Sequence, residues 1–418
     1  MNIPRTLHLL VGLLLAGFLA GCALEIPQAG EPTPTPLATL EASALPTPTT
    51  APSPTPVETP ISVSIPPRPP DFDQYRETIT RYLRDSGGDE DGLRSMLVDW
   101  GGLRHVTDLL RVDVDDDSLG ELLIVLVEPS PEYGINLRGD LLVLDRKDEM
   151  FELAYSAAGD SILLDPALIE VDDLNGDGQT EMAFSFTECG AHTCFTTVHI
   201  VTSGAGNYQN LTGEGIEMSY VEPHFSDWDS DGVRELIMHG GTIGSVGAGP
   251  QRERTEVYRW DGAAYVLSET VYDYSNYLYF RILDANQALL GGKYEMAATL
   301  YREAIDNPSL DVWMEESERE GLVAFSRYRL SLTYLVLGEV ELAQASLNEL
   351  LDEQPDSPYM QAAAVLWDTY QRTANLRAAC EEVGAFAASH PETAQVLADY
   401  GYSNPTFTAE EVCPLDLF

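Results

Sequence analysis

The chain is poor in positive charge. Among its 418 residues, 68 are acidic and 23 are basic, which gives a formal net charge of −45. Lysine is almost missing, since it occurs only as Lys147 and Lys293. A surface of this sign repels phosphate backbones and anionic lipid headgroups. The composition therefore argues against nucleic acid as a partner and against membrane docking through a basic face. A solubilising acidic surface accounts for most of the excess, and adaptation to high salt would look similar.

Long hydrophobic runs are also scarce, and the one near the N-terminus is short. Arg5 precedes an apolar stretch from Leu9 to Leu19, whereas a membrane-spanning helix needs about 20 residues. The stretch ends in Leu19-Ala-Gly-Cys22, which resembles the lipobox of bacterial lipoproteins. The resemblance implies a lipoprotein signal peptide over residues 1–22, lipidation of Cys22, and a lipid anchor on the extracytoplasmic face of the bacterial cell envelope. The alternative is a signal peptide followed by a chance cysteine.

Cysteine is rare, with five residues in the chain, and four remain when Cys22 is set aside. An even number is expected in an exported chain that forms disulfides. Cys189 and Cys194 lie between two strand candidates, where a disulfide would clamp a hairpin. Cys380 lies in a predicted helix, and Cys413 lies in a tail that could fold back onto it. The alternative for the first pair is a metal site of Cys189, His192 and Cys194, which offers no obvious fourth ligand.

Residues 23–70 are dominated by Pro, Thr, Ser and Ala, with more than half of all prolines in the chain. Such a segment cannot bury a core and adopts extended, polyproline-like conformations. We interpret it as a disordered linker that could hold the folded part on the order of 100 Å from the lipid, at roughly 3 Å per residue. Binding of partner domains by the Pro/Thr repeats is the less economical alternative.

Three acidic loops dominate residues 71–275, which we expect to hold a helical lead-in and then β-strands. The middle loop, Asp173-Leu-Asn-Gly-Asp-Gly-Gln-Thr-Glu181, has oxygen-bearing side chains at alternating positions and a glycine after the third. Because a tight turn folds these oxygens inward, the spacing is typical of a loop that holds one hard cation. A second copy begins at Asp227, and a weaker copy begins at Asp113, where Ser118 replaces the glycine. Each copy runs into an apolar segment, so the pattern describes a repeated unit.

These loops and the strands around them resemble the FG-GAP and VCBS repeat families over roughly residues 104–274. The resemblance implies structural calcium and blades of a propeller-like antiparallel β domain. Three units of about four strands are fewer than the four to eight blades of a usual propeller. Either the sheet stays open and helices cover its ends, or one blade is too divergent to recognise.

The resemblance also implies a set of calcium ligands. In the two later loops they are Asp173, Asn175, Asp177, the carbonyl of Gln179, Glu181, Asp227, Asp229, Asp231, the carbonyl of Val233 and Glu235. In the first loop the corresponding residues are Asp113, Asp115, Asp117 and Glu121. The alternative interpretation is a series of solvated acidic turns that bind no metal.

Residues 276–418 change to helix pairs. Small residues, aromatic residues and a closing proline recur in Ala288–Pro308, in Tyr328–Pro355 and, in degraded form, in Ala363–Pro391. This pattern resembles the tetratricopeptide repeat, and it implies an α-helical solenoid that follows the β domain. Asn375 stands where the third copy would have its turn glycine. An ordinary helical bundle is the alternative.

Catalytic motifs are missing from the sequence. There is no G-x-S-x-G, H-E-x-x-H or Walker loop, and the glycine-rich stretch Gly240–Gly249 opens no predicted helix. His199, His224 and His239 are isolated in sequence, so we assign them structural roles. No catalytic residue is predicted, and the chain is expected not to be an enzyme.

The function expected from these features is a non-enzymatic scaffold that binds a protein or peptide on the concave face of its helical domain. The first alternative is a glycan-binding or adhesive module that uses the loops Glu128–Arg138 and Gly240–Pro250, with cell-wall glycan as the partner. A cryptic hydrolase built from surface carboxylates ranks lowest.

Overall fold

The computed structural model describes residues 63–418 except 116, 131–134, 148–149 and 205–206. Cys22 and the Pro/Thr-rich segment as far as residue 62 lie outside the described residues. None of the described helices is both long and apolar enough to cross a membrane. Residues 60–418 form one compact unit, and the description below concerns this unit.

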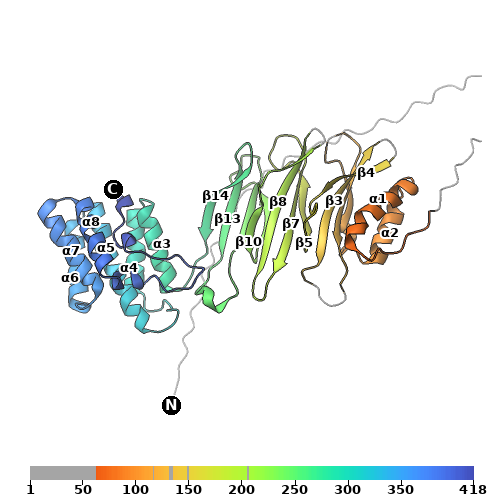
Figure 1. Ribbon diagram of the computed structural model, residues 1–418. Helices are drawn as coiled ribbons and strands as arrows, with labels where there is room; N and C mark the ends of the chain where they lie inside the picture. Colours follow the sequence, from red (N-terminus) through yellow and green to blue (C-terminus); the bar gives the residue numbers. More distant parts are fainter. Residues whose placement is uncertain (1–62, 116, 131–134, 148–149, 205–206) are drawn as a thin grey trace, which may run out of the picture. The chain divides into compact units, whose positions relative to one another are not determined.

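The described strands form three antiparallel sheets (Figure 1). The first sheet has the order β1-β2-β3-β4, with β5 paired to β3. The second has the order β10-β8-β7-β6, with β9 paired to β8, and the third has the order β11-β12-β13-β14. The strands are β1 (Leu109–Val112), β2 (Glu121–Val127), β3 (Arg138–Lys147), β4 (Met150–Ser156), β5 (Leu163–Leu164), β6 (Ala167–Asp172), β7 (Glu181–Cys189), β8 (Cys194–Gly204), β9 (Asn207–Asn210), β10 (Ile216–Ser219), β11 (Glu222–Ser226), β12 (Glu235–Gly240), β13 (Arg254–Trp260) and β14 (Tyr265–Tyr272).

The strands β2, β7 and β12, which follow the acidic loops, are largely buried. β2 lies between the second sheet and two helices, and β7 lies between the first and third sheets. All seven residues of β2 are buried, and alternate side chains enter different cores. Leu123 and Val125 pack in one cluster with Met182 and Phe184 of β7. The other face of β7 shares a further cluster with residues of the third sheet, Leu236 among them. A strand with two covered faces requires a continuous apolar sequence, which explains why these segments lack alternation.

Two helices cover the outer face of the first sheet. They are α1 (Tyr75–Asp85) and α2 (Glu90–Trp100), preceded by the short turn η1 (Phe72–Gln74). One buried stripe of α1 includes Tyr75, Ile79 and Tyr82, which follows helical spacing. The Asp89 side chain caps α2 by accepting a hydrogen bond from the Gly92 amide at 3.0 Å. The buried stripe of α1 packs on the side chains of β2 that point away from the second sheet.

Helices account for nearly all regular structure after β14. They are α3 (Leu278–Leu290), α4 (Tyr294–Asp306), α5 (Ser317–Leu337), α6 (Val340–Glu353), α7 (Pro358–Thr373), α8 (Leu376–Ser389) and the single turn α9 (Glu392–Gln395), with short 3₁₀ turns at 410–412 and 415–417. Neighbours pair as α3 with α4, α5 with α6 and α7 with α8, while α5 also contacts both α3 and α7. Asn375 caps the start of α8, and the left-handed residue at that turn is Ala374, with φ of 50°.

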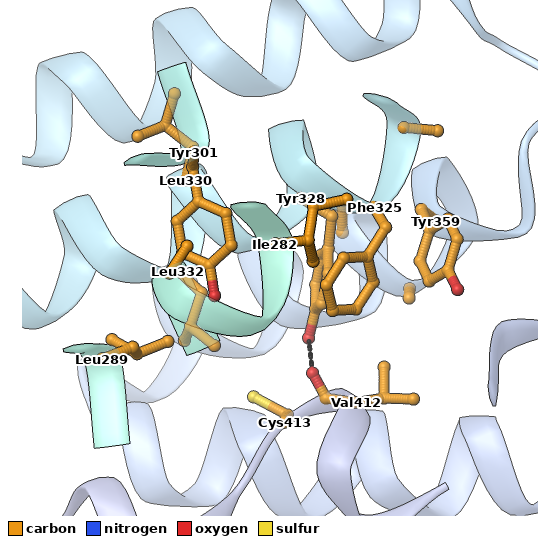
Figure 2. Close-up of a cluster of buried hydrophobic side chains, with 14 of the residues drawn as sticks. Ile282, Leu289, Tyr301, Phe325, Tyr328, Leu330, Leu332, Tyr359, Val412 and Cys413 are labelled. Carbon is orange, nitrogen blue, oxygen red and sulfur yellow. Dashed lines mark hydrogen bonds between the residues drawn. The ribbon is translucent and has the colours of Figure 1, made fainter. Parts of the chain in front are cut away.

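The helical core is aromatic and includes the C-terminal tail (Figure 2). Tyr328 and Phe325 of α5 are fully buried, and the Tyr328 hydroxyl donates a hydrogen bond to the Val412 carbonyl at 3.0 Å. A disulfide joins Cys413 to Cys380 of α8. The tail is therefore a structural part of this region.

The prediction of antiparallel sheets followed by helices is confirmed, and so are both disulfides. Among the described strands the sheets form no closed barrel or propeller. The sequence analysis missed β5 and β10, two strands of two and four residues that are too short to show a period.

Candidate metal centres in three acidic loops

The three acidic loops occupy equivalent places in the three sheets. Each joins the first strand of its sheet to the second: residues 113–120 lie between β1 and β2, 173–180 between β6 and β7, and 227–234 between β11 and β12. In each case the closing glutamate pairs across the ladder with the last residue of the preceding strand. The loops are thus held at their bases by rigid strands.

A buried glutamate closes every loop. Glu121, Glu181 and Glu235 are the first residues of β2, β7 and β12, and their exposed fractions are 0%, 0% and 2%. One oxygen, Oε2, accepts a hydrogen bond from the amide of the second loop residue in all three copies. The donors are Val114 at 2.7 Å, Leu174 at 3.0 Å and Trp228 at 2.7 Å. This repeated contact fixes the carboxylate beneath its loop and leaves Oε1 for another partner.

The first aspartate of each loop accepts hydrogen bonds from loop amides and so holds the turn closed. Oδ2 of Asp113, Asp173 and Asp227 accepts from residues 118, 178 and 232 at 3.0, 3.0 and 3.3 Å. The sixth residue has a left-handed backbone in every copy, with φ of 70° at Ser118, 86° at Gly178 and 93° at Gly232. Ser118 therefore adopts the glycine conformation despite its side chain, and at this position the first loop has the same backbone conformation as the other two.

Four further predicted side-chain ligands, Asp117, Asn175, Asp177 and Asp231, also accept hydrogen bonds from loop amides. The third acidic side chain accepts a hydrogen bond from the amide two residues later: Asp117 from Leu119 at 2.7 Å, Asp177 from Gln179 at 2.8 Å, and Asp231 from Val233 at 2.8 Å. Asn175 is 5% exposed and accepts from the Asp177 amide at 2.9 Å. Acidic side chains that bond to backbone amides in this way turn inward toward the loop.

Acidic oxygens converge in the first and third loops. Carboxylate oxygens of Asp113, Asp115 and Glu121 lie within 4.8 Å of one another, as do those of Asp227, Asp229 and Glu235. Asp145 of β3 joins Asp115 and Asp117 in a further group of this kind. The sequence analysis missed Asp145 because only the pairing of β3 with β2 brings it to the loop, and that register cannot be read from spacing.

Some oxygens in these groups are buried without a hydrogen-bond donor. They are Asp113 Oδ1 and Glu121 Oε1 of the first loop. Glu181 Oε1 of the middle loop, which belongs to none of these groups, is buried in the same way. A buried carboxylate oxygen without a partner is costly, and a cation would satisfy it. Burial raises the pKa of Glu121 to about 7, with a smaller contribution from Asp115 and Asp113. Burial also raises the pKa of Glu181. The residues present therefore fit a bound metal ion, and their donor atoms are oxygens only.

An arginine enters the third loop. Arg259 of β13 places Nη1 at 3.2 Å from Asp229 Oδ2 and Nε at 4.0 Å from Glu235 Oε1. This cation offsets part of the negative charge that the other two loops retain. This contact with the third loop was not predicted from the sequence because Arg259 lies on β13, and only the pairing of β13 with β12 brings it to the loop.

The structure removes one alternative metal site. Cys189 and Cys194 form a disulfide, so neither sulfur is available to a metal together with His192. His199 stacks on Phe184 at 5.6 Å between ring centroids, in a structural role, and burial lowers its pKa.

His239 is not isolated, contrary to expectation. Its Nε2 lies 3.2 Å from Asp273 Oδ2 and 3.9 Å from Glu253 Oε2, and all three side chains are exposed. His224 lies on β11 and pairs in the ladder with Ile237.

The loop Gly240–Pro250 is tied to the C-terminal segment. The Ala248 carbonyl accepts hydrogen bonds from Ser403 Oγ at 2.6 Å and from Asn404 Nδ2 at 3.1 Å. A side chain at Gly249, whose φ is 88°, would meet the Tyr400 carbonyl. This loop is therefore a packed connection over residues 248–250.

Comparison with known proteins gives no relative: no family model matches the chain, and neither the curated proteins nor the solved structures contain a match.

Proposed function

We propose that the chain is a calcium-binding, non-enzymatic scaffold on the bacterial cell envelope, which binds a protein or peptide through its helical region. The observation that carries the calcium assignment is the buried glutamate that closes each loop. In Glu121 and Glu181 its Oε1 has no hydrogen-bond donor, while Oε2 accepts a loop amide. Calcium suits such a site because it takes six to eight oxygen ligands, carbonyls included, in flexible geometry. Magnesium demands a nearly ideal octahedron and keeps several waters.

In this proposal the ion is structural. It neutralises carboxylates that otherwise repel one another at the base of each sheet, and it thereby holds the first two strands of each unit in register. The sheets are propeller-like units in an open stack, and the helix pairs form a tetratricopeptide-like solenoid. The pairing of successive helices and the contacts of α5 with both α3 and α7 support this second assignment.

The anchor and the location complete the proposal. Cys22 carries the lipid, and the Pro/Thr-rich segment spaces the folded part from the membrane. Two disulfides support an oxidising compartment. If Cys22→Ser left the protein processed and membrane-bound as before, the lipid anchor would be excluded.

Calorimetric titration of the purified full chain tests the metal assignment. We expect calcium to bind at two or three sites, and magnesium to bind much more weakly. Asp177→Asn and Asp231→Asn should each remove one site, while Asp261→Asn, in a turn outside the acidic loops, should remove none. Equal binding of both metals, or no loss in the loop variants, would contradict the assignment.

Affinity purification from native envelopes tests the scaffold. We expect a protein partner that no longer co-purifies when residues on the concave face of the helical region are substituted. The same purification in chelator is the control, and the partner should still be retained there. Retention on cell-wall glycan without a protein partner would favour the adhesive alternative instead. The loop Gly240–Pro250 supports that alternative poorly, since residues 248–250 pack against the C-terminal segment.

A further inference from the structure

One arginine of the helical region is buried without a counter-ion. Arg329 of α5 is 1% exposed, and neither its Nε nor its Nη1 has a hydrogen-bond partner. No carboxylate forms an ion pair with it anywhere in the described part of the chain. Guanidinium remains protonated in proteins, so burial cannot be relieved by loss of the proton.

Other buried arginines nearby do have acidic partners. Arg281 pairs with Asp284 and Glu303 at 3.6 and 3.8 Å, and Arg327 pairs with Glu353. The chain carries 68 acidic residues against 23 basic ones. A buried arginine that has no carboxylate partner is therefore unexpected in a chain with this excess of acidic residues.

The side chains around Arg329 do not replace an anion. Its charge acts on three nearby tyrosine hydroxyls, those of Tyr301, Tyr328 and Tyr359. Burial raises the pKa of Tyr301 to about 12, so this hydroxyl stays neutral. The Phe325 ring lies 5.3 Å from the guanidinium carbon and offers a cation–π contact. Such a contact offsets a buried charge only in part.

Arg329 lines a cavity of about 610 Å³. The wall of helical residues includes Phe280, Leu283 and Leu290 of α3 and Phe407 of the tail, all apolar. The opposite wall includes Pro250, Gln251, Arg252 and Arg254. An ion pair of 2.7 Å between Arg252 and Asp284 joins this wall to the helical region. This volume is in the range of small-molecule sites, roughly 300–1,000 Å³. The lining combines the apolar side chains with five charged residues, Glu217, Arg252, Arg254, Arg329 and Glu411.

Polar groups of both signs line the rest of the cavity. Arg252 and Arg254 are already paired, with Asp284 and Glu256, which leaves Arg329 as the lining arginine without an acidic partner among the described residues. Asn286 accepts a hydrogen bond from Tyr301 Oη at 2.5 Å through Oδ1, which leaves its Nδ2 group to donate. Gln287 lies beside it on α3. Glu411 also lines the cavity, but its Oε2 is used by the amide and hydroxyl of Thr408, at 2.7 and 3.0 Å. Glu217, on the strand β10, lines the opposite wall.

We infer that this cavity binds a small organic acid, with the carboxylate on Arg329 and the apolar body against Phe280, Leu283 and Phe407. A planar carboxylate matches guanidinium geometry, and the pair would supply the counter-ion that the protein lacks. The apolar wall selects an acid with a hydrocarbon body over inorganic anions. This site is independent of the acidic loops and of the proposed scaffold.

Thermal shift and calorimetry of the full chain test the inference with defined probes. The probes are hexanoate and phenylacetate at millimolar concentration, hexanamide as the neutral match, and inorganic phosphate. We expect the acids to raise the melting temperature and the amide and phosphate to have no effect. Arg329→Met should weaken acid binding by about tenfold or more, since a charged hydrogen bond is lost.

Two controls separate binding from folding. Arg302→Met removes an arginine of α4 that contacts Tyr334 instead, and it should leave acid binding unchanged. Gln287→Glu changes an exposed residue of the cavity rim, so this variant should fold and keep the wild-type melting temperature in the absence of the acids. The added negative charge should weaken binding of the acids. No acid-dependent shift in the wild type, an equal shift with hexanamide or phosphate, or an unchanged acid effect in both cavity variants would overturn the site.

Discussion

At the scale of single residues, the glutamates that close the first and middle acidic loops each have two oxygens with different roles. In Glu121, Oε2 accepts the Val114 amide, while Oε1 is buried with no donor. The first role is structural and needs no metal. Burial of the carboxyl raises its pKa, and a metal ion bound to Oε1 would compete with the proton.

The pH dependence of stability follows from Glu121. Its pKa is raised from 4.5 to about 7 in the folded protein, so the folded state binds the proton more tightly than the unfolded state does. In chelator, stability should therefore be greatest below about pH 4.5 for this group and should fall as the pH rises through 7. Calcium competes with the proton, so its stabilising effect should grow over the same interval.

The measurement is the melting temperature at a series of pH values with calcium and with chelator. Glu121→Gln should flatten the chelator profile because it removes the titrating group. A chelator profile that is unchanged in Glu121→Gln would show that another group is responsible.

Arg259 gives a second prediction at this scale. Its guanidinium lies 3.2 Å from Asp229 and competes with a cation for the third loop. Arg259→Gln should strengthen calcium binding there by roughly fivefold, since one unit charge at about 4 Å in water is worth about 1 kcal/mol. Calorimetric titration against the wild type measures the change, with Arg254→Gln, on the same strand, as the control. Weaker calcium binding in Arg259→Gln would mean that the arginine organises the loop.

At the scale of elements, the two disulfides stabilise segments of different length. The Cys189–Cys194 bond closes a hairpin between β7 and β8, with a sequence separation of 5. The Cys380–Cys413 bond joins the tail to α8, with a separation of 33, and lies beside the hydrogen bond that the Tyr328 hydroxyl donates to the Val412 carbonyl. A longer closed loop restricts the unfolded chain more strongly.

Removal of the second disulfide should therefore cost more. Cys380→Ser with Cys413→Ser should lower the free energy of unfolding by about 3–4 kcal/mol, and Cys189→Ser with Cys194→Ser by about 2 kcal/mol. Urea denaturation of both double variants gives the comparison. An equal loss in the two would indicate that native packing, and not chain entropy, sets the effect.

At the scale of the whole molecule, the acidic loops lie only in the β region, so metal removal should act unevenly. Each empty loop leaves carboxylates facing one another, at a cost on the order of 1 kcal/mol per pair in a water-like dielectric. Saturation at 100 times Kd stabilises by roughly 2.7 kcal/mol. Chelator should lower the unfolding transition of the sheets and leave that of the helices nearly unchanged.

Calorimetry of the full chain with and without chelator checks this expectation. Asp117→Ala, Asp177→Ala and Asp231→Ala should each reproduce part of the loss. The first loop is included because Ser118 adopts the left-handed backbone of the two glycines. If the chelator changed no unfolding transition of the chain, the loops would be acidic turns without metal.

Local patterns in the sequence were sufficient for the order of β-sheets before helices, the three loops and both disulfides. The acidic spacing from Asp173 to Glu181 and the apolar segments that follow each loop depend on residues that are close in the chain. Turn chemistry and helical or strand periodicity act over such short distances, so the sequence by itself determined them. The disulfides could be paired because one joins near neighbours and only one further pair remained.

Contacts between distant segments were decided by the tertiary structure alone. Asp145 and Arg259 reach the loops through strand pairing, and Arg329 meets its cavity through the packing of α5 against α3 and the tail. The burial of Glu121 is of the same kind, since the pKa depends on what covers the carboxyl. Strand register and core packing arise from long-range contacts, and spacing along one chain does not encode which faces meet.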